Sequence, residues 1–110
     1  MKFKQGVQAQ NVSREIWYGC GVLDSLFQCL TDKELIITSL TDGKHCRPDS
    51  KHYVGQALDA RNWHVTKEEY DLIINRAREI LVPLGFDIVP EKDHLHVEYD
   101  PKDKRKLELP

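Results

Sequence analysis

The feature that most constrains the fold of this chain is a well-marked helix that begins after Thr66. Thr66 and Glu69 have the spacing of a capping box, in which a hydroxyl and a carboxylate each bind the other residue's backbone amide. Pro83 and Gly85 end the pattern. Between them, apolar residues recur at helical spacing: Tyr70, Ile73, Ile74, Ala77, Ile80 and Leu81. The chain of 110 residues has room for one domain, so every other element must share one core with this helix.

A second helix is predicted to open at Ser13 and to run to Leu30. Gly19 and Gly21 weaken its first half, because glycine costs about 1 kcal/mol relative to alanine inside a helix. The pattern is therefore better defined from Val22 to Leu30 than before it.

Four short segments have the composition of strands. Residues 34–40 (ELIITSL) are rich in β-branched side chains and predict a buried strand. Residues 56–61 (QALDAR) predict a second short strand. Residues 86–89 and 95–99 predict a hairpin, with residues 90–93 as its turn.

The order of elements is helix, strand, loop, strand, helix, hairpin, and it predicts an α+β fold. We expect a small, mainly antiparallel sheet with helices packed on one face. Residues 41–51 are polar and contain glycine and proline, so they are predicted to be the loop. The whole chain, 1–110, is expected to be one domain, with loose termini over 1–12 and 101–110.

Composition narrows the classes of partner. The 16 basic and 18 acidic residues give a formal net charge of -2, which argues against a nucleic-acid surface. Cys20, Cys29 and Cys46 are an odd number without a CxxC pair, so reduced thiols are expected. The first ten residues lack the apolar run of a signal peptide, and no stretch has the length of a membrane helix. We therefore expect synthesis in the cytoplasm and no membrane partner.

Histidines beside carboxylates are the candidates for chemistry. The chain has five histidines: His45, His52, His64, His94 and His96. Three of them lie beside carboxylates in loops or at strand ends, whereas His64 precedes the capped helix and is expected to be structural. Catalytic zinc takes three protein ligands and leaves a position for water. The metal acidifies that water, and a nearby carboxylate accepts its proton.

Two segments supply such groups. Residues 50–59 (SKHYVGQALD) contain His52 and Asp59, with a glycine between them that allows a tight turn. Residues 93–99 (DHLHVEY) contain His94 and His96, which share one face if the segment is a strand. Asp93 stands at the start of this strand.

Together the two segments resemble the peptidoglycan D-alanyl-D-alanine metallopeptidases. That family includes carboxypeptidases, vancomycin-resistance dipeptidases and phage endolysin peptidases, and the hedgehog signalling domain shares its zinc fold. The first motif, S-x-H-x-x-G-x-A-x-D, is complete in Ser50, His52, Gly55, Ala57 and Asp59. The second is similar to residues 93–99, and the family strand before the first motif is similar to residues 36–39. The resemblance spans about residues 23–99.

The resemblance implies a single zinc site, with one Zn²⁺ per chain held by His52, Asp59 and His96. It also implies that Asp93, three residues before His96, is the general base. Glu91 in the same turn is the alternative base.

One departure from the family pattern concerns the substrate side of the site. Family members continue the first strand as Ser-Gly-Tyr-Arg, whereas residues 39–42 here read SLTD. His45 or Arg47 would then stabilise the oxyanion or hold a substrate carboxylate. Ser50 would contact substrate or cap its own loop. His94 would be a partner of a ligand, a donor to the transition state, or a solvent-facing residue.

The expected function is zinc-dependent hydrolysis of a peptide bond in the peptidoglycan stem, as a D,D-peptidase or an L-Ala-D-Glu-type endopeptidase. The enzyme would serve phage-type lysis or wall remodelling and would reach the cell wall or periplasm through a membrane breach. The first alternative is a non-catalytic, zinc-stabilised binding module; the missing arginine favours it and the retained Asp93 argues against it. The second alternative is a zinc hydrolase of another amide or a small dipeptide. The patterns leave endo- or carboxypeptidase action and the oligomeric state open.

Overall fold

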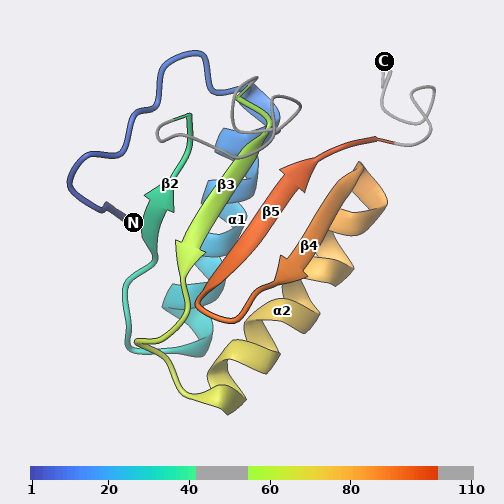
Figure 1. Ribbon diagram of the computed structural model, residues 1–110. Helices are drawn as coiled ribbons and strands as arrows, with labels where there is room; N and C mark the ends of the chain where they lie inside the picture. Colours follow the sequence, from blue (N-terminus) through green and yellow to red (C-terminus); the bar gives the residue numbers. More distant parts are fainter. Residues whose placement is uncertain (42–54, 102–110) are drawn as a thin grey trace.

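A five-stranded sheet with two helices on one of its faces forms the protein, as a computed structural model of residues 1–41 and 55–101 describes it (Figure 1). The strands lie in the order β1-β2-β3-β5-β4, and all neighbours are antiparallel except β1 and β2. The elements are β1 (Lys2–Phe3), α1 (Arg14–Leu30), β2 (Ile36–Ser39), β3 (Ala57–Arg61), α2 (Lys67–Leu81), the 3-10 helix η1 (Val82–Leu84), β4 (Phe86–Pro90) and β5 (His94–Tyr99). The expected α+β fold with a mainly antiparallel sheet is confirmed.

Helix α1 begins where Ser13 caps it and continues through its glycines. The Ser13 hydroxyl accepts a hydrogen bond from the backbone amide of Ile16 at 3.2 Å. Gly19 faces the sheet, and a Cβ atom there would lie 3.3 Å from the ring of Phe86. Gly19 therefore gives room for close packing between helix and strand, and this packing offsets the low helix propensity of glycine.

Helix α2 has the capping box that its sequence predicts. The Glu69 amide donates to the Thr66 hydroxyl at 3.1 Å, and the Thr66 amide donates to the Glu69 carboxylate at 2.9 Å. At the other end, η1 follows, and Gly85 adopts a left-handed conformation with φ of 101°. The predicted start and end of this helix are confirmed.

Strand β1 differs from the loose segment expected over residues 1–12. It pairs in parallel with β2, and the amides of Lys2 and Lys4 each donate at 2.8 Å, to the carbonyl oxygens of Leu35 and Ile37. The side chains of Lys2 and Phe3 are exposed. A strand of two residues is too short to show an alternation of apolar and polar side chains. Because only its backbone makes the pairing, the sequence did not predict it.

The core lies between the sheet and the helices. Alternate residues of β3 and β5 are buried toward α1 and α2: Leu58, Ala60, Leu95 and Val97. The residues between them point to the opposite face, which neither helix covers (Figure 1). Polar side chains of β3 and β5 therefore gather on this open face. Within the described ranges, neither helix is long and apolar enough to cross a membrane.

Candidate metal centre

The register of β3 and β5 determines which polar residues meet on the open face. Asp59 lies opposite His96, and two residues further along β3 Arg61 lies opposite His94. Directly opposite residues of an antiparallel pair have Cβ atoms about 5 Å apart. Segments that are distant in the sequence thus bring a carboxylate and two imidazoles together.

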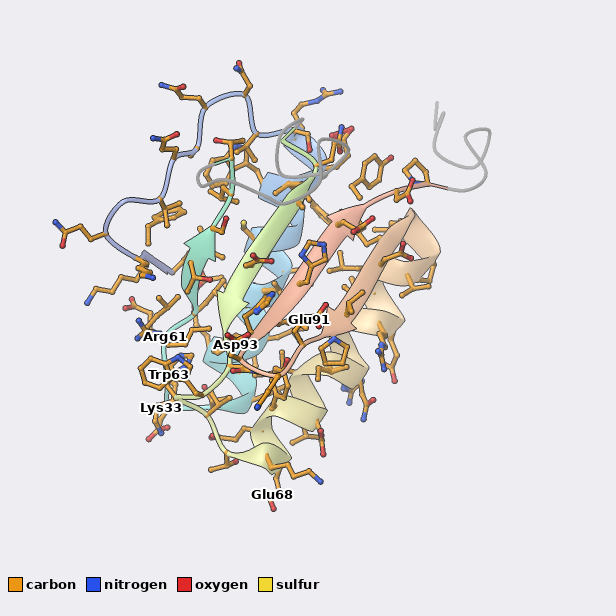
Figure 2. All side chains as sticks on the ribbon, in the orientation of Figure 1. Lys33, Arg61, Trp63, Glu68, Glu91 and Asp93 are labelled. Carbon is orange, nitrogen blue, oxygen red and sulfur yellow. The ribbon has the colours of Figure 1, made fainter. Side chains whose placement is uncertain are left out.

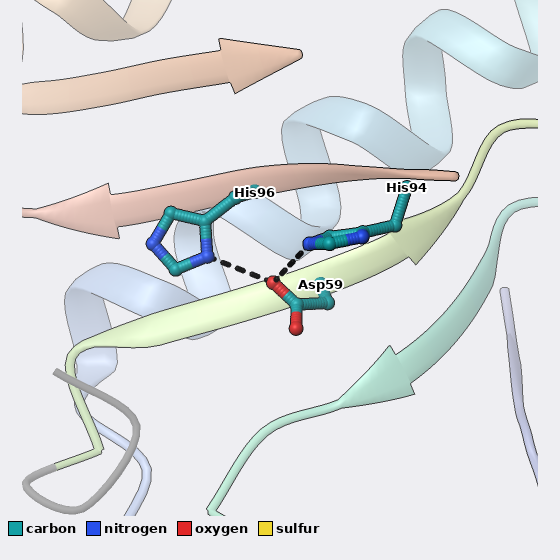
Figure 3. Close-up of side chains that lie close together, drawn as sticks. All are labelled: Asp59, His94 and His96. Atoms are coloured by element: carbon teal, nitrogen blue, oxygen red, sulfur yellow. Dashed lines mark hydrogen bonds and ion pairs between the residues drawn. The ribbon is translucent and has the colours of Figure 1, made fainter. Parts of the chain in front are cut away.

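Asp59 lies between the two histidines (Figure 3). Its Oδ1 atom is 2.8 Å from Nδ1 of His96 and 3.7 Å from Nε2 of His94. Ligand atoms of the three side chains all lie within 4.8 Å of one another. Each side chain is partly buried, with 17% of Asp59, 20% of His96 and 32% of His94 exposed. This group could hold a metal ion.

Two outer carboxylates contact the far sides of the imidazoles. Nδ1 of His94 is 2.7 Å from Asp93, and Nε2 of His96 is 2.9 Å from Glu98. Carboxylates and imidazoles therefore alternate in the order Asp93, His94, Asp59, His96, Glu98. A histidine that binds a metal commonly donates its other ring N–H to a carboxylate, which fixes the tautomer and the ring orientation.

The carboxylates next to His96 favour its protonated, positively charged form. Hydrogen bonding to Asp59 is the main cause that raises the pKa of His96 from 6.5 to about 9, and Glu98 adds to it against the opposing effect of burial. A neutral imidazole has one N–H, so only the imidazolium donates to both carboxylates. The surroundings of His96 thus stabilise a positive charge on its ring, between Asp59 and Glu98. Carboxylate oxygen with imidazole nitrogen is also a donor set that zinc accepts.

Asp93, the predicted base, lies at the outer end of the group. Its side chain is 83% exposed, and the hydrogen bond from His94 is the main cause that lowers its pKa below the usual value. The rival, Glu91, is exposed, and its backbone amide donates to the carbonyl oxygen of His94 at 2.9 Å to close the turn. Asp93 is thus connected to Asp59 through the ring of His94.

The remaining predicted site residues fall outside the described residues. These are His45, Arg47, Ser50 and His52. Zinc ligation by His52 therefore stays a prediction. The third member of the described group is His94, for which the sequence left three roles open: partner of a ligand, donor to the transition state, or solvent-facing residue. The H-x-H alternation indicated that His94 and His96 share a face, but the sequence did not indicate that both reach Asp59.

The glycine of the first motif has a structural role next to the site. Gly55 has φ of 73°, and a Cβ atom there would clash with the backbone oxygen of Asn11. The Ser13 amide also donates to the Gly55 carbonyl oxygen at 3.0 Å. Gly55 therefore allows the segment before α1 to pack against the start of β3.

Cys20 and His64 lie apart from the Asp59 group, whereas a cluster of carboxylates adjoins this group at Glu98. Burial raises the pKa of the Cys20 thiol to about 12, so this cysteine is inert. Nε2 of His64 is 2.8 Å from the carbonyl oxygen of Glu34, and its ring stacks on Phe27, as expected of a structural histidine. A second group, Asp87, Glu98 and Asp100, consists of carboxylates alone and offers no further observation of a ligand.

Comparison of the chain with protein-family models, with curated proteins and with solved structures found no match. The resemblance to the metallopeptidases therefore stands on the two sequence motifs.

Proposed function

We propose that the chain is a zinc-dependent peptidase that cleaves the peptidoglycan stem peptide. One observation supports this proposal above the others: Asp59 and His96, which come from two separate motifs, are cross-strand partners whose side chains are 2.8 Å apart. A metal site assembled from two motifs requires that their ligands meet. A coincidental likeness of two sequence strings gives no reason for this pairing.

Asp59 and His96 would hold the zinc ion, and Glu98 would keep the His96 ring in place through its contact with Nε2. The third ligand would be His52, as the motif implies, or His94, the nearest described imidazole. When bound, zinc would supply Lewis acidity toward water and the scissile carbonyl.

Asp93 would move the protons of the reaction. An aspartate is ionised at neutral pH, and the ionised form is the one that accepts a proton from the attacking water. It would then donate that proton to the leaving amine. If His52 is the third ligand, His94 would not bind the zinc ion. Its Nε2 atom, which lies 3.7 Å from Asp59, would then donate a hydrogen bond to the developing oxyanion, together with His45 or Arg47.

A non-catalytic zinc-binding module of the same fold is the second candidate. The high exposure of Asp93 and its contact with His94 favour it, because a base needs to reach the attacking water. Both candidates bind zinc, so turnover is the property that separates them.

The test uses zinc-loaded protein on purified peptidoglycan, with mass spectrometry of the released fragments. We expect new amino termini from the stem peptides and little action on casein. Asp93→Asn should keep its zinc and lower turnover roughly 100-fold or more, the range for a lost acid-base group. Glu91→Gln, a carboxylate of the same turn, is the matched control and should remain active.

Three other outcomes would change the proposed base, mechanism or function. An inactive Glu91→Gln beside an active Asp93→Asn would exchange the base and keep the class of enzyme. Full activity of both variants would contradict the carboxylate-assisted mechanism. A zinc-loaded wild type that releases no fragment would favour the binding module.

A phage-type lysis or wall-remodelling role, at the cell wall or in the periplasm, is part of the same proposal.

A further inference from the structure

We propose that Arg61 binds a carboxylate of the substrate and so selects stem peptides that carry a free carboxylate near the cleaved bond. The inference rests on the proposed peptidase function. Arg61 lies on β3, directly opposite His94 and two residues from Asp59 on the same open face. Residues two apart on a strand have Cα atoms about 7 Å apart, so a peptide of a few residues could bind Arg61 and the metal-capable group at the same time.

The guanidinium of Arg61 is held in place by an aromatic ring. Its Cζ atom lies 4.3 Å from the ring centroid of Trp63, and both residues lie together at the end of β3 (Figure 2). The indole contacts the His64 ring edge to face, and His64 in turn contacts the carbonyl oxygen of Glu34 at 2.8 Å. A guanidinium that rests with its face on a ring keeps its N–H donors available for a carboxylate.

Arg61 also differs from the arginines of α2 in its partners. Arg76 pairs with Glu79 at 3.3 Å, and Arg78 donates to the carbonyl oxygen of Ile88 at 3.2 Å. Within residues 1–41 and 55–101, no carboxylate lies at ion-pair distance from Arg61, and 69% of Trp63 is exposed. An incoming carboxylate can therefore reach this cation from solvent.

The carboxylates on the open face indicate why a substrate carboxylate would bind at Arg61. Asp93, Asp59 and Glu98 form a row of three carboxylates along the open face, and Arg61 lies near the Asp93 end of this row. His96 already contacts Asp59 and Glu98, so a substrate carboxylate next to this row needs a further cation as its partner. Arg61 supplies that cation at the His94 end of the row.

The end of β3 is tied to the turn that carries the predicted base. Nδ2 of Asn62 donates to the carbonyl oxygen of Glu91 at 3.3 Å. Arg61 and Asp93 therefore belong to two backbone segments that are fixed to each other. A peptide whose carboxylate binds Arg61 would have its neighbouring amide oriented relative to Asp93.

The carboxylate could belong to the C-terminus of the stem peptide or to a glutamate inside it. Three synthetic stem peptides separate these sources: the free acid, the C-terminal amide, and the form with the glutamate amidated. With zinc-loaded wild type, we expect amidation of the recognised carboxylate to raise KM roughly tenfold at a similar kcat, as for one charged hydrogen-bonded contact.

Substitutions of Arg61 test whether this residue causes the preference for the free acid. Arg61→Gln should lose the preference for the acid through KM, and Arg61→Lys should keep part of it because its charge remains. Arg76→Gln on α2 is the matched control and should behave as wild type. If Arg61→Gln fails to fold, the comparison of acid and amides on wild type and on Arg61→Lys still decides.

Calorimetric titration of the same peptides into the zinc-loaded protein separates this inference from the proposed function. Tighter binding of the acid without hydrolysis would contradict the peptidase and support the role of Arg61. Hydrolysis of acid and amides with equal KM, or a preference that persists in Arg61→Gln, would overturn the role of Arg61 and leave the peptidase standing. Absence of any binding preference together with absence of hydrolysis would overturn both.

Discussion

The Oδ1 atom of Asp59 lies 2.8 Å from Nδ1 of His96, across a strand pair that joins residues 37 positions apart. The same oxygen is 3.7 Å from Nε2 of His94. Each imidazole has a further carboxylate on its other nitrogen. The open face of the sheet thus carries a site for a positive charge, and a proton on His96 provides that charge.

The first prediction concerns the third zinc ligand. His96→Ala and Asp59→Ala should each abolish the binding of one zinc per chain, measured by elemental analysis of dialysed protein. His52→Ala and His94→Ala then discriminate: the variant that loses zinc identifies the ligand. Glu79→Gln on α2, which removes an exposed carboxylate remote from the site, should keep its zinc. Retention of zinc in both His96→Ala and Asp59→Ala would refute the site.

The second prediction concerns Glu98, which contacts His96 on the nitrogen that faces away from Asp59. Glu98→Gln should weaken zinc affinity roughly 10- to 100-fold, as for loss of the partner that orients a ligand. Competition with a zinc chelator measures the affinity. Glu79→Gln on α2 is the control, because it removes an exposed carboxylate remote from the site. Equal affinities in wild type and Glu98→Gln would show that His96 needs no such support.

Sequence patterns predicted the elements whose determinants are local. The capping box of Thr66 and Glu69 and the periodicity behind it need no tertiary information. The hairpin of β4 and β5 was confirmed to within a residue at its turn for the same reason. Strand β1 was missed because its two exposed residues pair only through their backbone.

The site was predicted less completely, because it depends on strand register. The two motifs named Asp59 and His96, and the structure pairs them. The alternation in β5 indicated that His94 shares their face, but its approach to Asp59 follows from tertiary pairing. Arg61 was not considered, because one arginine in a chain with 16 basic residues has no distinguishing pattern. Its position opposite His94 distinguishes it.

The third prediction is a pH dependence of the metal-free protein. The folded-state pKa of His96 is about 9, above the ordinary value of 6.5. A raised pKa means that the folded state holds the proton more tightly, so this stabilisation is complete below pH 6.5. It is lost as the pH rises through 9. Urea unfolding between pH 6 and pH 9.5 should show this decline, and Asp59→Asn should flatten it. A wild-type free energy of unfolding that is constant over this range would contradict the prediction.

The fourth prediction concerns the glycine of the first motif. Gly55→Ala should lower the free energy of unfolding by on the order of 1–3 kcal/mol, because its left-handed backbone and its contact with Asn11 exclude a Cβ atom. Gly21→Ala is the control, since a Cβ atom at Gly21 meets nothing within 4 Å inside α1. That change should be neutral or stabilise by up to about 1 kcal/mol. Chemical denaturation of both variants and of the wild type measures these changes. If Gly55→Ala is as stable as the wild type, the motif glycine has no structural role.

A zinc titration of metal-free protein in the presence of peptidoglycan shows whether hydrolysis depends on zinc at the Asp59 group. The release of new amino termini is followed as zinc is added. We expect release to rise in proportion to zinc, to saturate at one ion per chain, and to be absent in His96→Ala at every zinc concentration up to that point. Release that is independent of zinc, or that persists unchanged in His96→Ala, would contradict this expectation.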